Sequence, residues 1–85
     1  MNKKQQKIFE LIFKDPVQSN IKWKDIESLL ENLDAHITEG NGSRVRIELN
    51  GTRAVFHRPH PQRETDKGAL LSMRKFLIMA GVTTE

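Results

Sequence analysis

The fold is decided by the stretch Ser43-Arg44-Val45-Arg46-Ile47-Glu48-Leu49-Asn50-Gly51-Thr52-Arg53-Ala54-Val55-Phe56-His57-Arg58-Pro59-His60. Two runs of alternating apolar and polar residues flank Asn50-Gly51, the dipeptide that best fits a two-residue type I′ turn with positive φ at both positions. If these two residues form the loop, counting outward pairs Leu49 with Thr52 and, at the far end, Arg44 with His57. The stretch therefore predicts an antiparallel hairpin of known register.

This hairpin has two chemically different faces, because successive side chains of a strand point to opposite sides. One face is apolar and is expected to line a core: Val45, Ile47, Leu49, Ala54 and Phe56. The other is mostly cationic: Arg44, Arg46, Glu48, Arg53, Val55 and His57. On it, Glu48 lies opposite Arg53 and is expected to form a cross-strand ion pair. Antiparallel sheets tolerate one solvated face, so the cationic face is taken as the working surface.

Length and composition restrict the class of protein. The 85 residues are expected to form one domain, residues 1–85, and the absence of cysteine excludes disulfides, thiolate metal sites and a cysteine nucleophile. No apolar run approaches the roughly 20 residues that span a bilayer. The segment from Met1 to Lys7 is too polar to begin a signal peptide. A cytoplasmic protein without a membrane partner is expected.

The excess positive charge is concentrated in one part of the chain. Residues 1–43 hold six lysines against seven acids, residues 44–63 hold five arginines against one acid, and residues 64–85 hold three cations and three acids. Arginine presents a planar fork that suits phosphate. This patch indicates nucleic-acid binding, and the plainer alternative is a solvated strand face.

Hydrophobic spacing predicts three helices and one further strand. Helices are expected over residues 3–13, 23–33 and 67–80, and a strand over residues 35–39. The last helix is expected to begin at a cap formed by Thr65 or Asp66, to end before Gly81, and to turn Arg74 and Lys75 toward water. Its core face is Leu70, Met73, Phe76, Leu77 and Ala80.

The predicted order is α-α-β-β-β-α. This is an α+β fold in which a three-stranded antiparallel sheet packs on helices, and its β-β-β-α part looks like a double-stranded-RNA-binding fold with an extra N-terminal helix. Trp23 is expected in the core with Leu30, Val45, Ile47, Phe56, Met73 and Phe76, although a tryptophan can also stack on a base.

Five segments carry a resemblance to a known family: Trp23-Lys24-Asp25-Ile26-Glu27-Ser28-Leu29-Leu30, Gly42-Ser43, Pro59-His60, Lys67-Gly68-Ala69-Leu70 and the ending Phe76-Leu77-Ile78-Met79-Ala80-Gly81-Val82. In this order and spacing they resemble the HicA toxin family. The resemblance covers about residues 22–82 and leaves residues 1–21 as an N-terminal helical extension. It implies a double-stranded-RNA-binding-like fold and a metal-independent endoribonuclease that cleaves mRNA, inhibits translation and is neutralised by a HicB-like antitoxin.

The resemblance fails at one important position. The family's catalytic histidine directly follows Gly-Ser, and this chain has Arg44 there. The predicted register places His57 opposite Arg44, with about 4.5–5.5 Å between Cβ atoms. An imidazole there reaches nearly the same space, and histidine suits proton transfer near neutral pH. His57 is therefore our candidate general base or acid, with Arg44 and Arg46 as electrostatic partners.

The remaining candidates have weaker signals. His60 is a candidate second acid or base, or an RNA contact, and the alternative is a turn residue without a role. Arg46, Arg53, Arg58 and Lys67 are candidate RNA-binding residues, Lys67 because it begins a helix whose positive end attracts phosphate. His57 and His60 have no cysteine or nearby carboxylate to complete a ligand set, so no metal and no cofactor is expected. His36 is expected to be a surface residue.

Three function classes stay open on the sequence. The first is a HicA-type endoribonuclease toxin, and the second is a non-catalytic RNA-binding module that keeps the charged face. The third is a protein-interaction module whose arginines dock an acidic partner. Growth arrest on expression separates the first class from the others. Steep salt dependence of RNA binding separates the second from the third.

Overall fold

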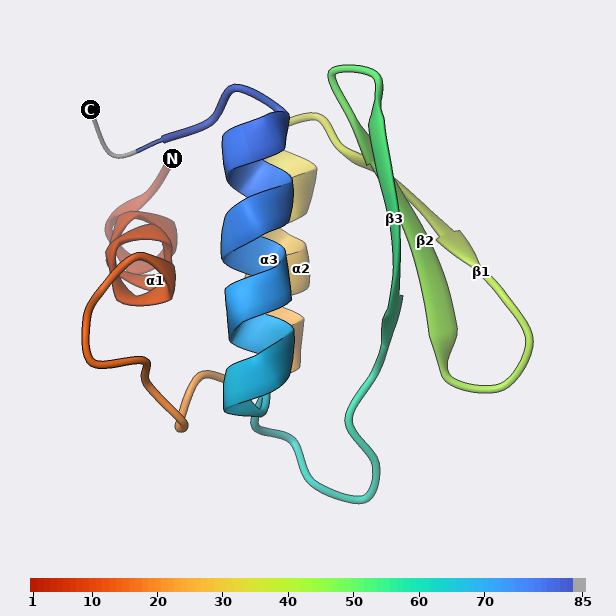
Figure 1. Ribbon diagram of the computed structural model, residues 1–85, viewed down its shortest axis with the longest axis horizontal. Helices are drawn as coiled ribbons and strands as arrows, with labels where there is room; N and C mark the ends of the chain where they lie inside the picture. The colour runs from red at the N-terminus through yellow and green to blue at the C-terminus, as the bar shows by residue number, and fades with distance from the viewer. Residues whose placement is uncertain (84–85) are drawn as a thin grey trace.

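The computed structural model describes residues 1–83 and shows a three-layer arrangement of helices and sheet (Figure 1). The elements follow in the order α1 (Lys3–Ile12), α2 (Trp23–Asn32), β1 (His36–Glu39), β2 (Arg44–Leu49), β3 (Thr52–His57) and α3 (Lys67–Met79). Helices α2 and α3 cover one face of the sheet, and α1 lies on their other side. The α+β class and the element order are as predicted. No helix in this part of the chain is long and apolar enough to cross a membrane.

The hairpin forms in the predicted register. Strands β2 and β3 pair from Leu49 opposite Thr52 to Arg44 opposite His57, and Asn50 and Gly51 have φ of 52° and 82°. The Asn50 Nδ2 also donates to the Ala80 carbonyl at 2.9 Å, which ties the turn to the end of α3. Strand β1 pairs antiparallel with β2, so the sheet order is β1-β2-β3.

The core lies between the sheet and the two central helices. The residues predicted for it are buried except Ala54, which is half-buried at its edge. Phe56 of β3 contacts two aromatic rings, Trp23 at 5.8 Å and Phe76 at 6.0 Å between centroids. The outer side of the central helices is covered by Ile8, Phe9 and Ile12 of α1, all buried. The N-terminal extension is thus part of the same hydrophobic cluster.

The start of α2 is held by backbone rather than by a capping side chain. Its N-cap is Lys22, which makes no side-chain cap hydrogen bond. Instead the Trp23 N–H donates to the Arg63 carbonyl at 3.0 Å, and the Thr65 N–H donates to the Ile21 carbonyl at 2.7 Å. Lys22 and Glu64 form a β-bridge between the segments that lead into α2 and α3. The starts of both helices are therefore fixed to each other.

The other helix ends follow local rules. Asn2 and Gln5 form a capping box at α1. Of the two candidates for the cap of α3, it is Asp66 that accepts the Ala69 N–H, at 2.7 Å. Gly81 has φ of 82°, and the Val82 N–H donates to the Leu77 carbonyl, as in a Schellman motif.

The expectation that Arg74 faces water is wrong. Its guanidinium donates to the carbonyls of Ile12 and Lys14, each at 2.9 Å, and pairs with Asp15 at 3.1 Å. The last carbonyls of a helix have no partner within the helix and attract cations. At the end of α1 that cation is the Arg74 guanidinium of α3. Lys75, beside it, is exposed as expected.

Candidate functional site

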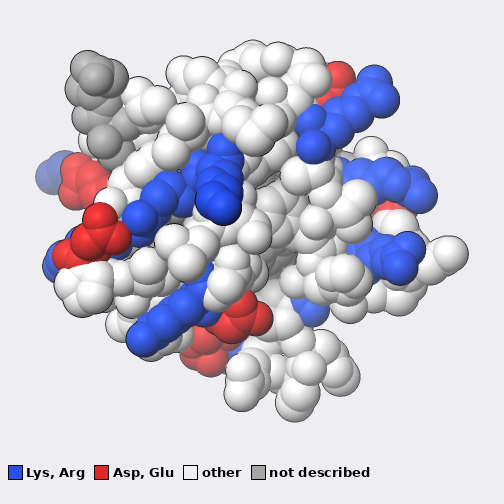
Figure 2. All heavy atoms as spheres, viewed as in Figure 1, with Lys and Arg blue, Asp and Glu red and all other residues white. Residues whose placement is uncertain are grey.

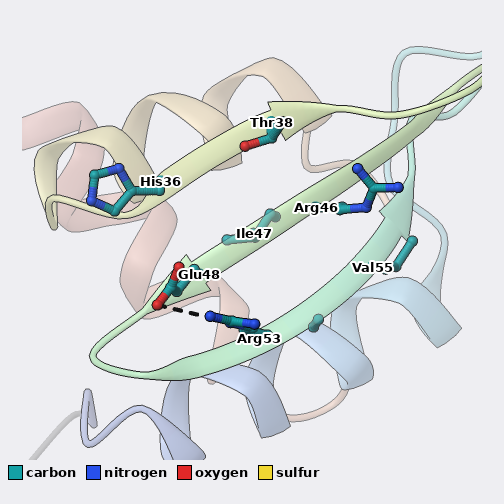
Figure 3. Close-up of a pocket in the computed structure, with 8 residues that line it drawn as sticks. His36, Thr38, Arg46, Ile47, Glu48, Arg53 and Val55 are labelled. Atoms are coloured by element: carbon teal, nitrogen blue, oxygen red, sulfur yellow. Dashed lines mark ion pairs between the residues drawn. The ribbon is translucent and has the colours of Figure 1, made fainter.

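The outer face of the sheet carries the predicted working surface. The side chains of Arg44, Arg46, Arg53, Val55 and His57 are all exposed. Figure 3 shows Arg46, Glu48 and Arg53 projecting from the side of the sheet that faces away from the helices, together with His36 and Thr38 of β1. They surround a shallow hollow of about 380 Å³. Glu48 and Arg53 form the predicted cross-strand pair, with 3.9 Å between Oε2 and Nε.

Arg44 and His57 lie opposite each other at the end of the hairpin. The Arg58 N–H donates to the Ser43 carbonyl at 2.8 Å, which makes Ser43 and Arg58 the hydrogen-bonded pair and Arg44 and His57 the adjacent non-hydrogen-bonded pair. In such pairs the Cα atoms are only about 4.5 Å apart, the closest cross-strand spacing in a sheet. An imidazole and a guanidinium therefore stand side by side on a solvent-exposed surface.

A glycine keeps the flank of Arg44 open. The Gly40 N–H donates to the Arg44 carbonyl at 2.9 Å, so Gly40 continues the alignment of β1 beside Arg44. A Cβ at position 40 would lie 3.1 Å from the Arg44 Cβ and 3.4 Å from its carbonyl oxygen. From the sequence, Gly40 was expected only to form a loop, although a glycine in a strand often marks such close approach of another backbone.

Arg58, one of the expected RNA contacts, is bound within the protein. Its guanidinium donates from Nε to Glu27 Oε2 at 2.7 Å and from Nη1 to both Glu39 oxygens at 2.7 and 2.8 Å. Glu27 also accepts a hydrogen bond from the Trp23 indole. These bonds, that to Glu27 first, raise the pKa of Arg58 above its ordinary value. Two carboxylates thus neutralise Arg58 and join the segment directly after β3 to α2 and β1.

The remaining candidates differ in exposure and position. His60 is exposed and lines a hollow of about 500 Å³ with Gly42, Ser43, Arg58 and Pro59. Lys67 is exposed in the first turn of α3. Trp23 is 4% exposed, so it packs in the core and presents no ring for a base to stack on. His36 is exposed on β1, as expected.

The charge of the sheet side is mostly positive. Figure 2 shows basic side chains along that side, at the right of the view, with few acidic atoms between them. Among the described residues, Arg44 and Arg46 make no ion pair, in contrast to Arg53, Arg58 and Arg74. Within residues 1–83, no three His, Cys, Asp or Glu side chains gather as a metal-binding group.

Comparison with known families identifies this arrangement. A family model described as the HicA toxin of bacterial toxin-antitoxin matches residues 23–81. The chain belongs to the HicA toxin family. No curated protein and no solved structure matches it.

Within this HicA chain, the family match begins at the first residue of α2 and ends just after α3. It includes the whole sheet and both central helices, and α1 lies outside it. Arg44 and His57, which are neighbours across the sheet, both lie within the matched residues.

Proposed function

We propose that this HicA chain is a toxin that cleaves mRNA as a metal-independent endoribonuclease and thereby inhibits translation. The supporting observation is the exposed pair of His57 and Arg44 at the end of the hairpin, with Arg46 two residues further along β2. Family membership supports the toxin role. A HicB-like antitoxin is the proposed partner, and it would neutralise the chain by covering His57 and the arginines.

The proposed reaction uses the RNA's own 2′-hydroxyl as nucleophile. His57 takes the 2′-hydroxyl proton, the 2′-oxygen forms a bond to the adjacent phosphorus, and the bond from phosphorus to the 5′-oxygen breaks. The products are a 2′,3′-cyclic phosphate and a 5′-hydroxyl, whose proton comes from a second acid. His60 is the proposed second acid, because it lies in the segment directly after β3. Arg44 and Arg46 stabilise the negative charge that develops on the non-bridging oxygens.

RNA binding is assigned to exposed cations of the sheet and of α3. Arg46 presents an exposed guanidinium, and Arg53 and Lys67 provide further exposed charges at the hairpin and at α3. Arg58 is assigned a supporting role instead, since Glu27 and Glu39 already occupy its donors. It holds the segment after His57 in place.

Expression of His57→Ala beside the wild type tests the assignment. General acid–base catalysis contributes about 10²- to 10⁴-fold, so His57→Ala should slow cleavage by that factor and abolish growth arrest. His36→Ala is the matched control, because His36 is also exposed on the outer sheet face. Growth and transcript integrity are scored in cells, and cleavage of a purified RNA in vitro. A His57→Ala protein that still cuts RNA at the wild-type rate would show that the mechanism is wrong.

A second function is favoured by Arg44 itself. An arginine cannot act as a base at cell pH, so a chain that carries it in the family's catalytic place is a candidate RNA-binding module without chemistry. In that case the wild type is harmless on expression and cleaves no RNA. It still binds RNA, and the affinity falls steeply with salt because counterions are released on binding.

A further inference from the structure

A further hollow, surrounded by basic residues, lies beside the one that contains His60, between the start of α2 and the segment that follows β3. It measures about 540 Å³ and is lined by Lys22, Trp23, Lys24, Arg58, Pro59, Pro61, Gln62 and Arg63. Its walls are fixed to each other, because the Trp23 N–H donates to the Arg63 carbonyl and Lys22 forms a β-bridge with Glu64. The hollow is therefore a built feature of the fold.

Three cations give this hollow its charge. Lys22, Lys24 and Arg63 are exposed, and none of them makes an ion pair among the described residues. Two nearby carboxylates are engaged by other cations, since Arg58 binds Glu27 and Lys4 pairs with Asp25 at 3.3 Å. Glu64 lies across the bridge from Lys22 without forming an ion pair. The uncapped start of α2 adds the positive end of a helix dipole to the same place.

The hollow adjoins the one that contains His60, the proposed second acid. It shares Arg58 and Pro59 with the hollow that contains His60 and Ser43. Arg44 and His57 line neither hollow, but they are the chain neighbours of Ser43 and Arg58 and lie at the same end of the hairpin, on its outer face. A strand of RNA whose phosphate lies between Arg44 and His57 must continue over the neighbouring surface. At the hollow it would meet the three cations that form no ion pair among the described residues, and the apolar surface of Pro59 and Pro61 between them.

We propose that Lys22, Lys24 and Arg63 form a binding site for the phosphates of single-stranded RNA next to the cleaved linkage. This site deepens the proposed function, since it names how the substrate is held beyond the reacting phosphate. RNA is favoured over an acidic protein because the cations adjoin the hollow that contains His60, the proposed second acid. They also surround a hollow with an apolar floor, on which sugars and bases can rest.

The test compares two triple variants of equal charge change. Lys22→Gln/Lys24→Gln/Arg63→Gln removes the three cations of the hollow and is called the groove variant. The control, Lys3→Gln/Lys7→Gln/Lys75→Gln, removes three exposed cations on α1 and α3. The probe is a fluorescent single-stranded RNA of about 12 nucleotides with 2′-O-methyl groups, which cannot be cleaved through its 2′-oxygens. Its affinity is measured against salt concentration. Each lost phosphate contact lowers the slope of log K against log salt by about 0.7, so the groove variant should lose about 2 in slope and at least about tenfold in affinity at low salt.

The outcomes separate this inference from the proposed function. Loss of affinity and slope in the groove variant alone supports the site, whether or not the wild type cleaves RNA. Unchanged RNA binding overturns it, even if the wild type is an active nuclease. The same holds if the groove variant binds RNA normally and loses only its affinity for an antitoxin, since the hollow then serves a protein partner. A charge-preserving variant, Lys22→Arg/Lys24→Arg, should bind as the wild type does, and thermal melts confirm that each variant is folded.

Discussion

Replacing Arg58 by methionine is expected to destabilise the protein by about 2 kcal/mol while leaving the electrostatic part of RNA binding nearly intact. The size follows from the exposure of the groups involved. The side chains of Arg58 and Glu27 are 32% and 19% exposed, whereas Glu39 is 70% exposed. Exposed ion pairs contribute about 0.2–1 kcal/mol, and breaking a buried pair costs about 3–5 kcal/mol. The pair with Glu27 lies between these limits, and the pair with Glu39 lies near the lower one.

These values convert to measurable melting temperatures. In a domain of this size, 1 kcal/mol corresponds to about 4–8 °C, so Arg58→Met should lower the Tm by about 8–16 °C. Glu27→Gln should cost nearly as much, because it removes the charge that faces both Nε and Nη2 of Arg58. Glu39→Gln is the matched control and should lower the Tm by about 2–4 °C. Thermal melts followed by circular dichroism provide the measurement.

Salt titrations of RNA binding give the second half of the test. Arg46→Gln should reduce the salt slope by about 0.7, because Arg46 makes no ion pair among the described residues. Arg58→Met should leave the slope unchanged below its lowered Tm. The reasoning fails if Glu39→Gln is as destabilising as Glu27→Gln, or if Arg58→Met lowers the slope as much as Arg46→Gln does.

Two further predictions concern Gly40 and α1. Gly40→Ala places a Cβ 3.1 Å from that of Arg44, so displacement by a few tenths of an ångström should slow RNA cleavage roughly three- to tenfold with little change in Tm. The effect should vanish in an Arg44→Ala background, and its persistence there would refute a route through Arg44. Ile12→Ala, at a position 1% exposed, should cost about 2–5 kcal/mol in urea denaturation. Leu71→Ala, at an exposed site on α3, should cost less than about 0.5 kcal/mol, and equal losses would show that α1 is not part of the core.

The sheet could be predicted from sequence because its signals are local. Alternation has a period of two, and a slip by one residue would turn Val45 and Ile47 from the core to water, so the register is strongly specified. Asn50-Gly51 then fixes where the chain turns. The placement of His57 opposite Arg44 follows from these two facts alone.

The contacts that the sequence did not show join residues far apart in the chain. Arg58 meets Glu27 at a separation of 31 residues, and Arg74 meets Ile12 at a separation of 62. A count of charges along the sequence cannot distinguish an arginine in solvent, such as Arg46, from one held between two carboxylates, such as Arg58. One signal was available for Arg58, since it follows the outward-facing His57 and so points toward the helices. For Arg74 and for the backbone partner of Trp23, no local pattern carries the information.

The bonds from Arg74 to the end of α1 also set an order of events during folding. Local contacts in the β-hairpin form readily, whereas contacts between distant segments must first overcome the entropy of closing a long loop. A chain leaving the ribosome presents α1 long before it presents Arg74, so α1 reaches its final position only after α3 has formed. Until then Ile8, Phe9 and Ile12 lack part of their cover. During synthesis this end of the chain is therefore the one that a chaperone would be expected to hold.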